Sequence, residues 1–183
     1  MNVLLGVTGC IAAYKACEIV RRLRDDGHEV QVILTESATR FVTPLSFSVL
    51  SGRTAATSLW EGDSQIDHIH LARWADVVVL APLTANTMGR LAHGMADNLL
   101  TTVVLATEAH VPLVLAPAMN TAMWENPWVK ANLDLLMAVD RCHLVKPVAK
   151  TLACGEEGVG ALASEAAIVA AVGNLADRDQ PSS

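Results

Sequence analysis

A short apolar run near the middle of the chain constrains the fold most. Residues 75–80 read ADVVVL and are rich in β-branched side chains. Such a run is typical of a strand covered on both faces, as in a parallel sheet. Residues 81–87, APLTANT, follow with a proline break, two hydroxyls and an amide before a helical pattern. Open α/β sheets bind ligands at the carboxyl ends of their strands, so we expect a polar or anionic ligand at this turn.

The rest of the chain alternates between strand and helix patterns. Residues 2–7 and 29–34 predict strands, and residues 11–25 between them predict an amphipathic helix. The other expected elements are helices over residues 43–52, 96–107, 121–139 (with a break near residues 126–127) and 164–175, and strands over residues 112–116 and 143–145. We therefore expect one α/β domain over residues 1–175, followed by a polar, disordered tail over residues 176–183.

Four turns follow the first four predicted strands, at residues 6–9, 35–38, 81–87 and 117–120. Because the carboxyl ends of parallel strands share one edge, these turns should converge. The first turn, GVTG, has neither the dinucleotide-binding spacing nor the P-loop spacing. Residues 53–63 predict a loop or an edge hairpin. The glycine-bearing residues 146–160 predict a loop that acts as a functional lid.

Composition favours a small-molecule partner. The 183 residues carry a formal net charge of −6, which argues against a general nucleic-acid or anionic-membrane surface. The four cysteines form no CxxC pair, so we expect reduced thiols in the cytoplasm. The apolar content of 52% occurs without a run of about 20 residues that could span a bilayer. Burial of apolar surface between subunits of a homo-oligomer would explain that content.

Several side chains could carry chemistry. His68 is a candidate acid or base, although a lone histidine is more often structural. His70 raises a metal interpretation, but no ligand cluster at suitable spacing completes it, and no metal is expected. Cys154 lies in the glycine-bearing segment and is either a reactive thiol or a packed residue. Asn86 and Asn120 suit a carboxylate or a heteroaromatic edge, or act only as caps.

Five motifs in order carry a resemblance that spans residues 2–175. They are GVTGCIAAYK, HIHLARWAD, APLTANT, APAMNTAMW and ACGEEGVG, and together they resemble the motifs of the flavin-dependent cysteine decarboxylases. The resemblance implies a three-layer, flavodoxin-like (Rossmann-like), doubly wound parallel sheet that binds FMN at a subunit interface of a homotrimer. In some members four trimers form a dodecamer. The chain departs from the family where Ala161 replaces a common arginine and Cys10 a glycine or serine.

The resemblance also implies roles for individual residues. His68 would be the base, Asn120 would hold the substrate carboxylate, Met123 would contact the substrate chain, and Arg73 would meet substrate from a neighbouring subunit. The residues implied to line FMN are Gly9, Cys10, Thr35, Thr84, Ala85, Asn86 and Met119.

The implied reaction oxidises the substrate's cysteine moiety to a thioaldehyde, which loses carbon dioxide. The resulting enethiol is reduced by the same flavin, and Cys154 donates the proton. That cysteine favours the coenzyme A branch, which converts 4′-phosphopantothenoylcysteine to 4′-phosphopantetheine. The alternatives are a peptidyl-cysteine decarboxylase that stops at the enethiol and a non-catalytic regulatory flavoprotein. Many bacterial members are fused to a phosphopantothenate–cysteine ligase, so a separate ligase or a longer parent chain is expected.

Overall fold

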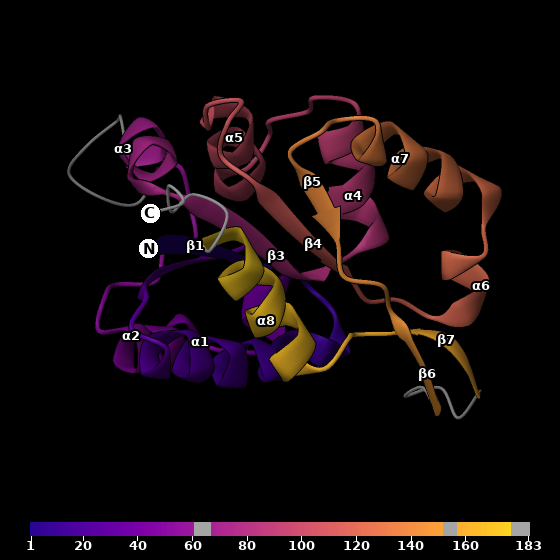
Figure 1. Cartoon of the computed structure of the whole chain (residues 1–183), viewed down its shortest axis with the longest axis horizontal. Coiled ribbons are helices and arrows are strands. Elements are labelled where there is room, and N and C mark those ends of the chain that lie inside the picture. Colours follow the sequence, from indigo (N-terminus) through magenta and orange to yellow (C-terminus); the bar gives the residue numbers. More distant parts are fainter. Residues whose placement is uncertain (61–66, 152–156, 177–183) are drawn as a thin grey trace, which may run out of the picture.

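The computed structural model describes residues 1–60, 67–151 and 157–176. Its centre is a five-stranded parallel sheet in the order β2-β1-β3-β4-β5 (Figure 1). The strands are β1 (Asn2–Val7), β2 (Glu29–Leu34), β3 (Val77–Leu83), β4 (Leu113–Pro117) and β5 (Cys142–Leu144). This order reverses direction between β1 and β3, which confirms the doubly wound, flavodoxin-like sheet and marks where such folds bind ligands.

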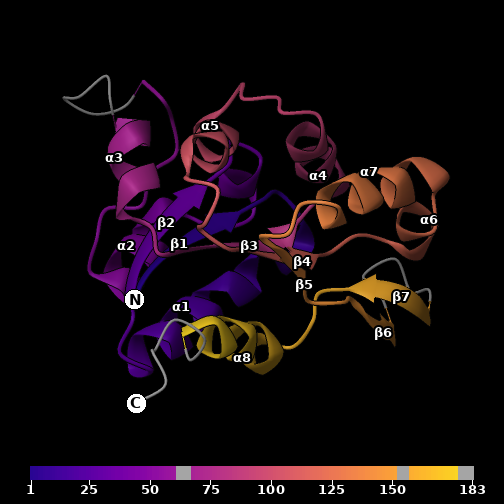
Figure 2. The ribbon, with the colours of Figure 1, turned by 45° about the horizontal axis from the view of Figure 1, so that its top comes forward.

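Helices cover both faces of the sheet, which gives three layers (Figure 2). One face packs against α1 (Lys15–Asp25), α2 (Pro44–Ser51) and α8 (Glu165–Ala176). The other face packs against α3 (Asp67–Trp74), α4 (Ala85–Ala92), α5 (Leu99–Ala106) and α7 (Pro127–Met137). Alternate side chains of each strand enter opposite cores, as Val3 and Leu4 do. Both faces of the central strands are therefore apolar. Among the described residues, every helix is too short or too polar to cross a membrane.

Local sequence explains most helix ends. Within α1, Ile19, Val20 and Leu23 are buried, and the helix is followed by Gly27 at φ 83°. Helix α2 has Pro44 in its first turn and Gly52 at φ 73° after its last residue, as predicted. The predicted helix over residues 11–25 begins instead with a 3-10 turn, η1 (Ile11–Tyr14). A second 3-10 turn, η2 (Ala38–Arg40), follows β2.

Strand β3 is longer than predicted, because it continues through Pro82 to Leu83. A register shift against β4 falls between Leu80 and Leu83, and such irregularities tolerate a proline without an N–H donor. The Thr8 hydroxyl donates to the Pro82 carbonyl oxygen over 2.7 Å and accepts from the Thr84 N–H over 2.9 Å. These bonds hold the end of β3 against the turn after β1. Helix α4 begins at Ala85, which lies within the turn predicted at residues 81–87.

Three segments differ from the predictions. The predicted lid contains an antiparallel hairpin of β6 (Val148–Thr151) and β7 (Glu157–Ala161), rather than a loop throughout. Residues 53–60 form one parallel bridge, Ala56 to Ile33, beside β2, so no edge hairpin exists among these described residues. Helix α3 was not predicted. Helix α8 reaches Ala176, so the expected tail, apart from that residue, lies outside the described residues.

The predicted break near residues 126–127 is confirmed. It separates a short helix, α6 (Thr121–Trp124), from α7. The Asn126 side chain accepts from the Trp128 N–H over 3.0 Å and so begins the second helix, with Pro127 at its first position. This break leaves α6 beside the end of β4 and in contact with β7.

Candidate functional site

A cavity of about 970 Å³ lies at the carboxyl edge of the parallel sheet. Residues that follow β1, β2, β3 and β4 all line it, together with the end of β7. We call these four post-strand turns the rim. Their predicted convergence is confirmed, and the volume is near the upper end of the usual range of about 300–1,000 Å³ for ligand pockets. The predicted site residues that line the cavity are Gly9, Cys10, Thr35, Thr84, Ala85, Asn86, Met119, Asn120 and Met123.

The turns after β1 and β2 are in direct contact. A Cβ atom placed on Gly9 would overlap the Ser37 Cβ and lie 2.7 Å from the Ser37 carbonyl carbon. Only glycine allows this approach, because any larger residue would push the two turns apart. Burial raises the pKa of the Cys10 thiol, while hydrogen bonds from the backbone N–H groups of Ala12 and Ala13 partly oppose that effect. The backbone N–H groups at the start of η1 therefore lie beside the cavity, where Cys10 accepts from those of Ala12 and Ala13.

Two further features mark this end of the cavity as a place for a polar ligand. The Thr35 hydroxyl oxygen is buried and has no hydrogen-bond partner among the described residues. Nearby, the Lys15 ammonium group lies 3.2 Å from the Glu165 carboxylate and joins α1 to α8. A buried hydroxyl without a partner is costly, so a ligand atom that bonds to it would stabilise the complex.

The α4 side of the cavity is polar as well. Thr84 caps α4 and accepts from the Thr87 N–H over 3.5 Å. The Arg90 Nε donates to the Asn86 Oδ1 over 3.4 Å, and the Arg90 guanidinium forms an ion pair with Asp97. Arg90 and Asp97 line the cavity but were missed in the sequence. One signal in the sequence could have indicated this region. Asn98, directly after Asp97, is a residue type typical of a helix start, and it caps α5.

On the α6 side, Asn120 serves as a helix cap. Its Oδ1 accepts from the Met123 N–H over 2.8 Å. The adjacent Met119 N–H donates to the Gly160 carbonyl oxygen over 2.9 Å, which holds β7 against the turn after β4. Met123 is 45% exposed. Asn120 thus acts as a cap, one of the two roles left open by the sequence, and its amide nitrogen remains available for a ligand.

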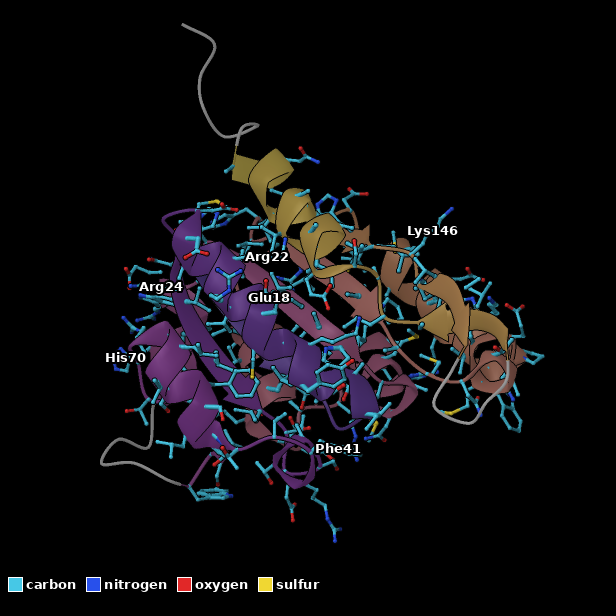
Figure 3. The ribbon with its side chains drawn as sticks, turned by 90° about the horizontal axis from the view of Figure 1, so that it is seen from below. Glu18, Arg22, Arg24, Phe41, His70 and Lys146 are labelled. Carbon is cyan, nitrogen blue, oxygen red and sulfur yellow. The ribbon has the colours of Figure 1, made fainter. Side chains whose placement is uncertain are left out.

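The remaining predicted site residues do not join this cavity within one chain. His68 and Arg73 lie on α3 and are absent from the cavity lining. Helix α3 lies at the opposite end of the molecule from α6 and the β6–β7 hairpin (Figures 1 and 2). His70 is exposed on the outer side of α3 (Figure 3). Cys154 lies outside the described residues. No cluster of three or more potential metal ligands occurs in the part of the chain that the structure describes.

The arrangement suits a large ligand with one anionic end. Backbone donors at η1 and the Thr35 hydroxyl can bind a phosphate or another anion. Apolar side chains from the turn after β4 and from Leu162 offer a surface for a planar ring. Asn120 adds a polar group beside that surface, so a cofactor and a second ligand can meet there.

The comparisons with known proteins agree with this geometry. The Flavoprotein family model matches residues 1–177. The chain is 47% identical over 163 residues to the coenzyme A biosynthesis bifunctional protein CoaBC of Bacillus subtilis, a match that covers 88% of this chain and 39% of that protein. It is 44% identical over 164 residues to a probable phosphopantothenoylcysteine decarboxylase of Streptococcus mutans, with 88% and 91% covered. The chain thus spans well under half of the bifunctional relative.

Solved structures share the whole fold. A PPC decarboxylase mutant complexed with pantothenoylaminoethenethiol superposes with a TM-score of 0.85 at 36% identity, covering 96% of this chain and 98% of that one. The FMN binding protein AtHal3 superposes with a TM-score of 0.83 at 36% identity and 98% coverage of both chains. A family model that matches nearly the whole sequence, together with these relatives, shows that the chain belongs to the Flavoprotein family.

Proposed function

We propose that this protein is an FMN-dependent decarboxylase that converts 4′-phosphopantothenoylcysteine to 4′-phosphopantetheine in coenzyme A biosynthesis. The observation that carries the proposal is the rim cavity, in which a cofactor-sized space lies beside the Asn120 amide. The 44–47% identity to proteins named for this reaction or this pathway supports it. The similarity to these relatives extends over 88% of the chain, and the residues 1–177 that match the Flavoprotein family model include the rim and α6.

The residues present fit FMN. Its phosphate would bind at the backbone donors of η1, and the Thr35 hydroxyl would gain the hydrogen-bond partner that it lacks among the described residues. Gly9, Cys10 and Met119 would line the cofactor with the residues at the start of α4, which are Thr84, Ala85 and Asn86. When bound, FMN supplies a two-electron acceptor that can return the electrons within the same turnover.

The protein would orient the substrate and move protons. Asn120 would donate to the substrate carboxylate, and Met123 would contact the neighbouring part of the substrate chain. His68 would act as the base, Arg73 would bind substrate from a neighbouring subunit, and Cys154 would protonate the enethiol carbon as the product forms. A cavity closed to water keeps these groups oriented and stops the reactive sulfur species from escaping.

A homotrimer would complete the site. In one chain neither His68 nor Arg73 lines the cavity, so a neighbouring copy would have to bring them there. Large apolar side chains are available for such contacts, because Leu45 is 71% exposed, Val49 is 74% exposed and Trp60 is 88% exposed. Assembly of four trimers into a dodecamer is the larger form of the same proposal. A phosphopantothenate–cysteine ligase, separate or on the same polypeptide, would supply the substrate, and the reaction would take place in the cytoplasm.

The test is an anaerobic incubation of the purified protein with 4′-phosphopantothenoylcysteine. Mass spectrometry identifies the product while the visible absorbance follows the flavin. The expected result is loss of carbon dioxide alone, with the flavin oxidised at the end. Loss of carbon dioxide plus two hydrogens, with a bleached flavin, would contradict the complete reaction and favour an enethiol-forming enzyme. Its natural substrate would then be a peptidyl cysteine. A protein that binds FMN but leaves the substrate unchanged would favour a regulatory flavoprotein.

A further inference from the structure

A buried glutamine joins the edge strand β2 to the segment that follows α2. Gln31 lies among buried apolar residues of β2 and is 6% exposed. Its Nε2 donates to the Thr54 carbonyl oxygen over 2.8 Å, and its Oε1 accepts from the Arg53 Nε over 3.0 Å. A buried polar side chain needs such partners. Here both ends of the amide hold one short segment, Arg53 and Thr54, against the sheet.

Arg53 is held at its backbone as well. Its N–H donates to the Ser51 hydroxyl oxygen over 3.2 Å, and that hydroxyl donates to the Arg53 carbonyl oxygen over 3.0 Å. Ser51 is buried at the end of α2. The guanidinium carbon of Arg53 lies 4.7 Å from the centre of the Trp74 ring, which is within the range of a cation–π contact. Arg53 thus connects β2 and α2 to the last residue of α3.

Helix α3 has little other burial to hold it in place. Of residues 68–74, Ala72 alone is buried, and the helix packs mainly on α5. His68 precedes Trp74 on the same helix, and the helical rise places the two residues about 9 Å apart along its axis. A tilt of about 10° at the Trp74 end would therefore displace His68 by roughly 1.5 Å. The contact at Trp74 thus controls where His68 lies.

We propose that Arg53 is a positioning residue that, through Trp74, fixes the direction in which α3 presents His68. This inference rests on the proposed function, in which His68 is the base. Arg53, Gln31 and Trp74 do not line the rim cavity, and the proposed contacts to FMN come from the rim. Loss of the guanidinium should therefore slow proton transfer by His68 and leave the cofactor bound.

The experiment uses the holoenzyme and compares Arg53→Met with Arg53→Lys. Methionine keeps an apolar stem and removes the cation, whereas lysine keeps a cation that can lie over the Trp74 ring. We expect kcat to fall about 10- to 100-fold in Arg53→Met, because a displacement of about 1 Å can cost this much in rate, and to fall less in Arg53→Lys. The visible absorbance of bound flavin should be unchanged in both.

Arg24→Met is the matched control. Arg24 pairs with Glu29 of the same strand over 2.6 Å, but it lies on α1 rather than beside α3. The substitution therefore removes a guanidinium bound to β2 without touching the contact at Trp74. We expect both kcat and bound flavin to stay at the values of the wild type.

Two double variants test the route of the effect. Trp74→Leu removes the ring that Arg53 contacts, so Arg53→Met/Trp74→Leu should have the same kcat as Trp74→Leu alone. His68→Asn removes the base, so Arg53→Met/His68→Asn should have the same kcat as His68→Asn alone. A general loss of stability would instead lower kcat further in each double variant.

A second readout does not depend on turnover. Backbone hydrogen exchange within residues 71–74 reports how firmly the end of α3 is held. Exchange should accelerate in Arg53→Met and in Trp74→Leu, and it should stay at the wild-type rate in Arg24→Met. If Arg53→Met does not fold, Trp74→Leu decides, because it leaves the bond between Arg53 and Gln31 in place.

The outcomes separate this inference from the proposed function. Unchanged kcat in Arg53→Met overturns the inference, as does loss of bound flavin in that variant or a loss of kcat that adds fully to the loss in His68→Asn. A wild-type enzyme that releases no carbon dioxide overturns the proposed function instead. In that case hydrogen exchange in α3 still tests the contact between Arg53 and Trp74.

Discussion

The rim and helix α3 contribute to the proposed active site in different ways. The rim is assembled within one chain, because a parallel sheet brings the carboxyl ends of its strands to one edge. Helix α3 carries His68 and Arg73, yet it lies at the far end of the molecule from α6 (Figure 1). The difference teaches that one chain is enough to form the cavity, whereas the proposed base would reach a cavity only through assembly of subunits. Cofactor binding and turnover should therefore respond separately to substitutions in the two regions.

Replacement of His68 should have the largest effect. His68→Asn should lower kcat about 100- to 10,000-fold, because a positioned acid or base contributes rate factors of this size. The flavin absorbance of the purified protein should be unchanged, since the proposed contacts to FMN come from the rim and do not include His68. Steady-state kinetics and the visible spectrum check both parts of this prediction.

His70→Asn is the matched control for this prediction, because His70 is exposed on the same helix (Figure 3). Subunit mixing sharpens the comparison further. When His68→Asn and an inactive Asn120 variant are refolded together, mixed oligomers should regain activity, since some cavities receive an intact His68 from a neighbour. Mixtures that stay inactive would indicate that the base and the cavity belong to the same chain. They would contradict the proposal that His68 acts in the cavity of a neighbouring subunit.

Asn120→Asp should weaken substrate binding about 10- to 100-fold, because two carboxylates would then lie close together. The melting temperature should change little. Aspartate caps helices as well as asparagine does, so the bond from the Met123 N–H survives. KM and thermal melting check these expectations. Asn126→Asp, at the cap of α7, is the control and should leave KM unchanged. Equal KM values in wild type and Asn120→Asp would remove Asn120 from carboxylate binding.

Thr35→Val should weaken FMN binding about tenfold, which corresponds to a lost hydrogen bond of about 1.4 kcal/mol. Unfolding of the apoprotein should not become easier, because the Thr35 hydroxyl has no partner among the described residues. Thr39→Val should show the opposite pattern, with easier unfolding of the apoprotein and unchanged FMN affinity. It removes a hydroxyl that donates to the Glu36 carbonyl oxygen over 2.7 Å, and Thr39 does not line the cavity. Titration of apoprotein with FMN and urea unfolding distinguish the two variants, and unchanged FMN affinity in Thr35→Val would contradict the cofactor assignment.

The smallest effect is expected at the ion pair between Lys15 and Glu165. A hydrogen bond from its own backbone N–H and the contact with Lys15 lower the pKa of Glu165 below its ordinary value of 4.5. The pair therefore stabilises the fold fully above that pH, and the contribution is lost as pH falls through the lowered pKa. Glu165→Gln should cost less than about 1 kcal/mol at pH 7 and nothing in strong acid. Urea unfolding at both pH values tests this, and a difference that persists in acid would contradict the assignment.

The sequence predicted the rim well because its signals are local. The apolar run at residues 75–80 marked the central strand, and turn residues after each strand marked the edge where the cavity lies. Convergence followed from the rule that parallel strands place their carboxyl ends together. The extension of β3 through Pro82 could not be predicted, because it depends on the Thr8 hydroxyl, which is 74 residues away in sequence.

Two regions depended on contacts that the sequence pattern does not contain. Helix α3 is short and carries mixed polar and apolar residues, so its pattern was weak, and it is stabilised by packing on α5. The β6–β7 hairpin has glycines where strands usually have side chains, which favoured a loop prediction. Those glycines are explained only by Thr121 and Met119, which lie against β7. The proposed placement of His68 at a cavity would depend on more than one chain.

The cap formed by Asn120 also bears on how the product leaves. Its oxygen already accepts the Met123 N–H, so the unengaged polar group that the side chain offers to a ligand is its amide NH2, which donates. Such a donor binds the carboxylate of a substrate well. It has no acceptor to bond to after that carboxylate has been lost. Substrate and product of the proposed reaction differ at that very group. The chemical step would thus remove the group that Asn120 binds, and inhibition by accumulated product should be weak.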